Sequence, residues 1–406
     1  MVLIQHLFGI PSLRQTYREI QVNMAYRWFL GYNLLDKIPH FATVSYAFCK
    51  RFPPALATEI FEHILNKGIN NRMVDPSVIF IDGTHIKASA NKKKHQKAQV
   101  AKVAKIYDEQ LRAEVNAERE ALGKSLIEDD DDDDEPPMVE KTVSTTDPDA
   151  GMFVKGEHER QFAYEAHTVC DKNGMVLDAE VTSGNVHDSV AWDSVYDRVV
   201  GEYDVSFAVM DAGYKTPWIA KKVLESGRIP ILPYTRYKGA KERYKPCEYE
   251  YDPINDCYTC PRGGVLRHTT TDRDGKRIYR STPKNCKDCP CKYKCGANEK
   301  GQKVFARHIW QEHLDLVEQL RKTERGRELY ARRKETIERV FADAKEKHAM
   351  RYTHHRGLAR VTNWVRLKYA TMNLKKLAVW SWDTFIYFAF SPFLRLLDLK
   401  TTAFVH

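Results

Sequence analysis

Three acidic residues of the chain stand on predicted elements of secondary structure and could bind metal ions together. Asp82 ends the segment SVIFID, Asp211 ends the segment VSFAVMD, and Glu338 lies on the helical segment KETIERVFADAK. Carboxylates from separate elements can hold two divalent cations ~3.5–4 Å apart, which stabilise the attacking and leaving oxygens when a phosphodiester reacts. Mg²⁺ prefers such oxygen ligands. Taken singly, the two aspartates also suit turns, because Asp-Gly and Asp-Ala-Gly are turn sequences.

Glu338 is predicted to lie at the edge of a buried helical stripe. Lys334 precedes it by one helical turn and Lys345 follows it by two, on the same face. One interpretation is a solvated charge pair that stabilises the helix by ~0.2–0.5 kcal/mol. The other is a metal-binding carboxylate flanked by lysines that contact phosphate. The stripe itself has the i, i+3, i+4, i+7 spacing of a helix that packs on a core, and consists of Ile337, Val340, Phe341 and Ala344.

Cysteines form a second group with chemical potential, since seven of the nine lie between Cys247 and Cys295. Paired Cys-x2-Cys motifs suit tetrahedral Zn²⁺ in structural sites. By spacing alone, the ligands would be Cys257, Cys260, Cys286 and Cys289. Thiolates do not suit the metals of phosphoryl transfer, so this site would be separate from the three carboxylates. The alternative is a set of reduced thiols without a metal.

The charge of the chain indicates the class of partner. The formal net charge is +9, although the run EDDDDDDE at 128–135 contributes eight acidic residues. The rest of the chain is therefore strongly basic, which favours an anionic polymer as partner. The N-terminal segment has neither the basic region nor the cleavage site of a secretory signal, and no apolar run reaches the ~20 residues of a membrane span. We therefore expect a cytoplasmic, nucleoid-associated protein.

The predicted elements give an α/β order. Residues 12–70 show helical periodicity, as a helix-turn-helix or a helical bundle. Residues 91–158 form a charged insertion, with an exposed helix and a disordered part after Lys124, because few apolar residues are available to offset the entropy of ordering. Asn173-Gly174 predicts a hairpin. The remaining pattern predicts a mixed sheet flanked by helices, with strands at 77–88, 161–171, 175–185, 205–211 and 229–234 and helices at 187–200 and 216–227.

In this order, the segments resemble the DDE transposases of bacterial insertion sequences, most closely the insertion sequence 1182 group. The motifs that carry the resemblance are IDGTHIKA, SGNVHDS, VMDAGY, IERVFADAK, HHRG and NLKKLA. The resemblance implies an RNase H-like catalytic domain whose triad, Asp82, Asp211 and Glu338, binds Mg²⁺ or Mn²⁺. It also implies a structural zinc held by Cys260, Cys286, Cys289 and Cys295, with Cys257 as an alternate ligand. The expected contacts to DNA are Lys334, Lys345 and Arg356.

The chain departs from the family pattern in two places. Related transposases carry a Y-x2-R-x3-E-x6-K signature, of which Glu338-x6-Lys345 is intact. Lys334 occupies the arginine position and Ala331 the tyrosine position, with Tyr330 one residue early. Family members also carry a longer region before the position that matches residue 1, so this copy is expected to be truncated and weakened in binding DNA ends.

The predicted function is metal-dependent DNA cleavage and strand transfer at insertion-sequence ends. The partners would be double-stranded DNA at transposon ends and target DNA, bound by a homo-oligomer and not by a membrane protein. The alternative is a catalytically impaired, zinc-containing DNA-binding protein. His85, His187 and Asp188 are expected to have structural roles or to support the site without binding the catalytic metals. The expected regions are a helical DNA-binding-like region, a catalytic domain, the charged insertion, a cysteine-rich insertion and a C-terminal tail, at 1–75, 76–380, 91–158, 240–300 and 381–406.

Overall fold

The structure, a computed structural model, has two compact units. It describes residues 1–51, 53, 55–101, 107–127, 138–155, 159–236, 240 and 242–402. The first unit contains Met1–Ala98, Lys141–Val209 and Ala331–His406, and the second contains Gln99–Glu140 and Met210–Tyr330.

The first unit is built on a β-sheet with the strand order β2-β3-β4-β5-β1-β7. Strand β6 also pairs with β5, along the residues that follow those paired with β4. Strands β1 and β5 are antiparallel, with Asp82 opposite Thr168. The predicted strands at 77–88, 161–171 and 175–185 are confirmed. The strands are β1 (Val78–Lys87), β2 (His95–Ala101), β3 (Met138–Ser144), β4 (Gly151–Lys155), β5 (Glu159–Asp171), β6 (Val176–Ser183) and β7 (Phe207–Met210).

The predicted hairpin joins β5 to β6. The buried Asp171 side chain accepts hydrogen bonds from the N–H groups of Asn173 and Met175 at 2.9 and 2.7 Å. Gly174 has a φ of +73°, a conformation that glycine adopts without steric cost. The turn chemistry of the sequence therefore fixes the register of the two strands.

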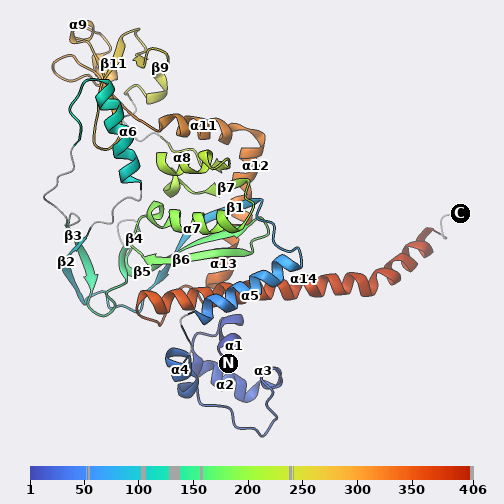
Figure 1. Ribbon diagram of the computed structural model, residues 1–406. Coiled ribbons are helices and arrows are strands. Elements are labelled where there is room, and N and C mark those ends of the chain that lie inside the picture. Colours follow the sequence, from blue (N-terminus) through green and yellow to red (C-terminus); the bar gives the residue numbers. More distant parts are fainter. Residues whose placement is uncertain are drawn as a thin grey trace. The chain divides into compact units, whose positions relative to one another are not determined.

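Helices cover both faces of this sheet (Figure 1). Helix α7 packs on β5 and β6, and Ser194 and Arg198 of α7 contact Glu180. Since neighbouring residues of a strand point to opposite faces, Thr168 faces away from α7 and contacts Tyr369 of α14. Helix α13 packs on β1. The bounds are α7 (Asp188–Glu202), α13 (Ile337–Glu346) and α14 (Leu358–Thr402).

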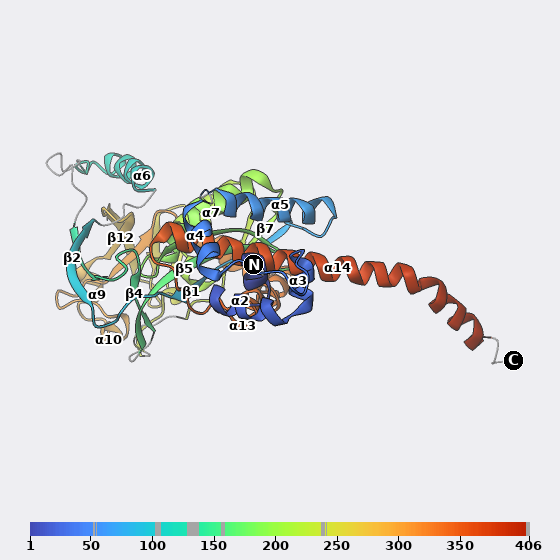
Figure 2. The same ribbon diagram turned by 90° about the horizontal axis from the view of Figure 1, so that it is seen from below.

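The N-terminal region is helical, as predicted, and packs on the long helix α14. Helix α5 runs beside the long helix α14 (Figure 2). Helix α1 also contacts α14. The predicted tail from residue 381 continues α14 as far as Thr402. No described helix, α14 included, combines the length and the apolar character that a membrane span needs. The elements are α1 (Val2–Leu7), α2 (Leu13–Val22), α3 (Met24–Phe29), α4 (Phe41–Lys50) and α5 (Leu56–Asn70).

The second unit contains a five-stranded antiparallel sheet in the order β13-β12-β11-β10-β9. Its aromatic core consists of Tyr249, Tyr258, Leu266 and Tyr279. The strands of this sheet are β9 (Glu250–Asp252), β10 (Cys257–Thr259), β11 (Val265–Thr271), β12 (Lys276–Ser281) and β13 (Val304–His308). Strand β8 (Ile229–Ile231) lies outside it. The helices are α6 (Asp108–Ala121), α8 (Pro217–Glu225), α9 (Pro283–Cys286), α10 (Lys292–Cys295), α11 (Gln311–Lys322) and α12 (Glu324–Arg332).

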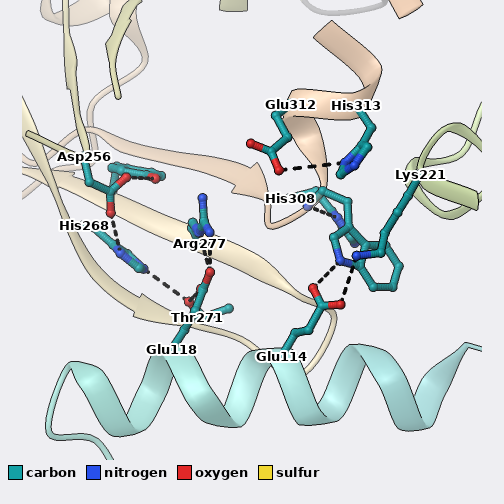
Figure 3. Close-up of polar contacts among 12 residues, drawn as sticks. Glu114, Glu118, Lys221, Asp256, His268, Thr271, Arg277, His308, Glu312 and His313 are labelled. Atoms are coloured by element: carbon teal, nitrogen blue, oxygen red, sulfur yellow. Dashed lines mark hydrogen bonds and ion pairs between the residues drawn. The ribbon is translucent and has the colours of Figure 1, made fainter. Parts of the chain in front are cut away.

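The charged helix predicted within residues 92–124 exists as α6 but is shorter, because residues 95–101 form β2. The expectation that it is exposed holds for most of its residues but not for one apolar face. Leu111 and Val115 are buried, at 4% and 0% exposure, against a cluster that includes Trp310. The polar residues of the same helix also find partners (Figure 3). Glu114 accepts hydrogen bonds from Trp310 Nε1 and Lys221 Nζ at 2.5 and 3.1 Å. Glu118 accepts from Thr271 Oγ1 at 2.8 Å and pairs with Arg277.

The second part of the insertion is also more ordered than predicted. Residues 138–144 form β3, and the turn after it buries Asp147 at 1% exposure. The Asp147 carboxylate accepts hydrogen bonds from Tyr164 Oη at 2.8 Å and from the N–H of Gly357 at 3.1 Å. These long-range contacts supply the stabilisation that composition alone did not indicate. The acidic run at 128–135 lies within residues 128–137, which are outside the described residues.

Candidate active site

Asp82 lies in the middle of β1, and the residues before it explain why the chain forms a buried strand there. Val78 to Ile81 are at most 3% exposed and are β-branched or aromatic, which favours strands. The side chain of Asp82 is 16% exposed. Its Oδ1 accepts a hydrogen bond from the N–H of Gly83 at 2.9 Å. The strand therefore holds a nearly buried carboxylate in a fixed position.

Arg333 links Asp82 to Glu338. Its Nη2 donates to Asp82 Oδ2 at 2.5 Å, and its Nη1 is 3.5 Å from Glu338 Oε1. Arg333 is 8% exposed, whereas the Glu338 side chain is 49% exposed. Two of the three predicted carboxylates, from β1 and α13, thus face one guanidinium cation.

A short turn places this arginine. Helix α12 ends at Arg332, a 3₁₀ turn spans Arg333–Glu335, and α13 begins at Ile337. Arg333, one residue before Lys334, makes the contacts to Asp82 and Glu338. Tyr330 and Arg333 also have the Y-x2-R spacing of the signature, with four residues instead of three between Arg333 and Glu338. The sequence analysis did not single out Arg333.

The buried stripe predicted for α13 is confirmed. Ile337, Val340, Phe341 and Ala344 are at most 8% exposed. Glu338 borders this stripe and remains exposed. The helix is thereby held on β1 by its apolar face, while Glu338 is left free to reach the region of Asp82.

The three predicted DNA contacts differ in their surroundings. Lys334 and Arg356 are exposed, and Arg356 Nε donates to the carbonyl oxygen of Ser89 at 2.9 Å. Lys345 is half-buried and lines a cavity of about 500 Å³ together with other basic residues, among them Arg351 and Lys368. Their contacts to DNA stay predictions.

Asp211 directly follows β7 and precedes a 3₁₀ turn over Ala212–Tyr214. It thus ends a buried strand, since Ala208 to Met210 have 0% exposure. Asp211 is among the first residues of the second unit. Its convergence with the other two carboxylates stays a prediction.

A further polar cluster lies on the α7 face of β5, where Gly83 of β1 is opposite His167. Glu165, His167 and Asp188 each offer a ligand atom, and these atoms lie within 4.8 Å of one another. His85 belongs to the same face, with Nδ1 at 3.4 Å from Glu165 Oε1. The sequence analysis missed Glu165 and His167. The available signal was the pair of polar residues two positions apart in an otherwise apolar strand.

Burial dominates the electrostatics of this cluster. Burial, followed by the charge and hydrogen bond of Asp188 and the charge of Asp82, raises the pKa of Glu165 to about 8. Burial lowers the pKa of His167 to about 4. At neutral pH, the histidine is therefore neutral and Glu165 is mostly protonated when no cation is bound.

The cysteines of the second unit lie on turns that suit a metal knuckle. Cys260 Sγ accepts a hydrogen bond from the N–H of Gly264 at 3.2 Å. Burial raises the pKa of the Cys295 thiol, and the nearby Cys286 and Cys289 thiols add to this shift. Burial also raises the pKa of Tyr249, as do the charges of Cys295 and Cys260. No trio of cysteine sulfurs in the described residues lies within 4.8 Å, so the zinc quartet stays a prediction.

The pair formed by Asp82 and Glu338 fits a divalent metal on chemical grounds. Both side chains are oxygen donors, and both face the positive charge of Arg333 in this structure. A site that already gathers two carboxylates around one cation offers the ligands that Mg²⁺ requires.

Family models match two parts of the chain. The model described as "Transposase DDE domain" matches residues 259–378, and the model described as "Transposase domain (DUF772)" matches residues 1–50. The first range contains Glu338 but neither Asp82 nor Asp211. No curated protein and no solved structure matches the chain.

The mixed α/β sheet with helices on both faces is consistent with the RNase H-like fold predicted from the sequence. The two matches support an insertion-sequence DDE transposase, a class of protein that binds DNA and depends on divalent metal.

Proposed function

We propose that this transposase catalyses Mg²⁺-dependent cleavage and strand transfer at the ends of its insertion sequence, within the insertion sequence 1182 group. Asp82, Asp211 and Glu338 would be the metal ligands, and Mn²⁺ could replace Mg²⁺. The observation that carries the proposal is the bridge from Arg333 to Asp82 and Glu338. Residues 256 positions apart in the sequence supply carboxylates to one cation.

The proposed reaction has two steps, and each one exchanges one P–O bond for another. A water oxygen bonds to the scissile phosphorus as the P–O3′ bond breaks, which leaves a 3′-hydroxyl at the transposon end. That hydroxyl then attacks a phosphodiester of the target, and the 3′ oxygen of the target strand leaves. Bound Mg²⁺ supplies charge stabilisation for the attacking and leaving oxygens.

Residues of the chain supply binding and orientation. Asp82 is fixed by β1 and its bond to Gly83, so its carboxylate needs little reorganisation. Arg333 neutralises the carboxylates in the absence of substrate and is placed to donate to a phosphate oxygen when DNA arrives. Lys334, Lys345 and Arg356 would neutralise further phosphates, which makes affinity depend on salt.

The remaining features fit the same proposal. A structural zinc would be held by Cys260, Cys286, Cys289 and Cys295, the quartet that the family resemblance implies, and Cys286 and Cys289 contribute to the raised pKa of the Cys295 thiol. Cys257 is a weaker candidate, since it lies in β10 at 8% exposure. We further propose that the protein acts in the cytoplasm, as a homo-oligomer on transposon-end and target DNA.

The test compares Glu338→Gln with the matched control Glu335→Gln, which alters an exposed glutamate three residues earlier. Loss of the Glu338 charge should reduce Mg²⁺-dependent nicking of transposon-end DNA by at least about 10²-fold, a typical effect of removing one catalytic electrostatic group. DNA affinity, measured across a salt series, should change little. The control should nick normally.

Two results would contradict the proposal. Normal nicking by Glu338→Gln would make this residue a surface charge. DNA binding by the wild-type protein with no nicking in Mg²⁺ or Mn²⁺ would favour the alternative, a catalytically impaired DNA-binding protein.

A further inference from the structure

We propose that Glu165, His167 and Asp188 form a second divalent-cation site, which takes a first-row transition ion and lies on the opposite face of the sheet from Asp82. This site is separate from the catalytic metal site and does not depend on the proposed function. It would tie the N-terminus of α7 to β5 directly behind the Asp82 strand.

The geometry suits one ion. Glu165 and His167 are two positions apart on β5 and therefore point to the same face, and Asp188 is the first residue of α7. Their ligand atoms lie within 4.8 Å of one another. Atoms bound at ~2.0–2.2 Å to one ion can be at most ~4.4 Å apart. A small movement of Asp188, whose side chain is 31% exposed, closes the difference.

His167 provides an independent indication of a ligand. It is 1% exposed, and its Nδ1 is buried without a hydrogen-bond partner. The distance from His167 Nδ1 to Asp188 Oδ1 is 4.0 Å, which is too long for a hydrogen bond. A buried polar atom without a partner costs about 1–3 kcal/mol. A cation at this point would bond to that nitrogen.

The other nitrogen of the ring is already fixed. His167 Nε2 lies 3.0 Å from Thr182 Oγ1 on β6. With Nε2 protonated and donating to Thr182, the Nδ1 lone pair is directed into the cluster. A hydrogen bond that orients a metal-binding imidazole in this way is the usual partner of a histidine ligand.

Gly83 leaves the space that an ion needs. A Cβ atom at this position would lie 2.6 Å from Glu165 Oε1 and 3.3 Å from Asp188 Oδ1. Glycine therefore keeps the side of β1 that faces the two carboxylates open. His85, two residues further on, approaches Glu165 Oε1 and can orient this carboxylate.

The ligand set selects the class of ion. One imidazole nitrogen and two carboxylates suit Mn²⁺, Zn²⁺ and related ions, whereas Mg²⁺ prefers oxygen ligands alone. The proposed catalytic site contains carboxylates and no histidine. A histidine nitrogen bound to the metal is therefore a signature of the second site alone.

The experiment uses the full chain, freed of metal and titrated with Mn²⁺, with pulsed EPR detecting nitrogen coupling to the ion. We expect histidine nitrogen coupling in the wild-type protein and in Glu338→Gln, which lacks a catalytic ligand. His167→Gln should abolish the coupling. Asp188→Asn, which keeps the size of a side chain that is 31% exposed, should lower the Mn²⁺ affinity of the coupled site by about tenfold or more.

The matched control is Asp197→Asn, which makes the same change at an exposed position later in α7 and should leave coupling and affinity unchanged. Absence of nitrogen coupling in the wild-type protein at saturating Mn²⁺ would overturn the proposal. Unchanged affinity in Asp188→Asn would also overturn it, whether or not His167→Gln folds.

Discussion

Replacing Arg333 tests whether this residue occupies the place of a cation between Asp82 and Glu338. Arg333→Met keeps an unbranched stem but removes the guanidinium that contacts Asp82, whose side chain is 16% exposed. Breaking a buried ion pair costs about 3–5 kcal/mol, and the exposure of Glu338 favours the lower value. At about 2–4 °C per kcal/mol for a unit of this size, the melting temperature should fall by roughly 6–12 °C without divalent metal.

Mg²⁺ should restore much of this loss, because it replaces the missing charge. At one hundred times its dissociation constant, a ligand stabilises the folded state by about 2.7 kcal/mol. The assay is thermal unfolding of wild type, Arg333→Met and the control Arg339→Met, which alters an exposed arginine of α13. An Mg²⁺-induced increase no larger in Arg333→Met than in the other two proteins would refute the reasoning.

Two further predictions concern stability. Burial lowers the pKa of Lys368 to about 7, so between about pH 7 and 10.5 the unfolded chain binds the proton more strongly and stability should rise with pH, by at most about 1.4 kcal/mol per unit. Lys368→Met should remove that slope from the melting temperature, and an unaltered slope would exclude the assignment. Leu111→Ala should destabilise the second unit by about 2–5 kcal/mol, whereas Leu122→Ala, at an exposed position, should have little effect. Tryptophan fluorescence reports this unfolding, because Leu111 packs near Trp310, and equal effects of the two changes would contradict the packing described for α6.

Local patterns predicted the elements that hold Asp82 and Glu338. The β-branched run before Asp82 and the helical stripe around Val340 are each complete within a dozen residues, and both are buried as expected. The Asn173-Gly174 turn likewise encodes its own hairpin. Such signals survive because backbone geometry, and not distant partners, decides them.

Features that depend on distant partners could not be predicted in this way. Leu111 and Val115 stand among charged residues, and only Trp310, almost two hundred positions later, shows why they are buried. Arg333 was missed because its role depends on Asp82, which lies 251 positions earlier in the sequence. His167 becomes visible as a candidate ligand only when α7 brings Asp188 beside it.

The first unit is assembled from three separate stretches of the chain, and the last of them begins at Ala331. During synthesis, the ribosome therefore releases β1, β5 and β6 long before it makes Arg333 and Glu338. A nascent chain, or one shortened by an early stop codon, carries Asp82 without its partner carboxylate. Under the proposed function, the order of translation would withhold DNA-cutting capacity from unfinished copies, because Glu338 is made after the other two proposed metal ligands.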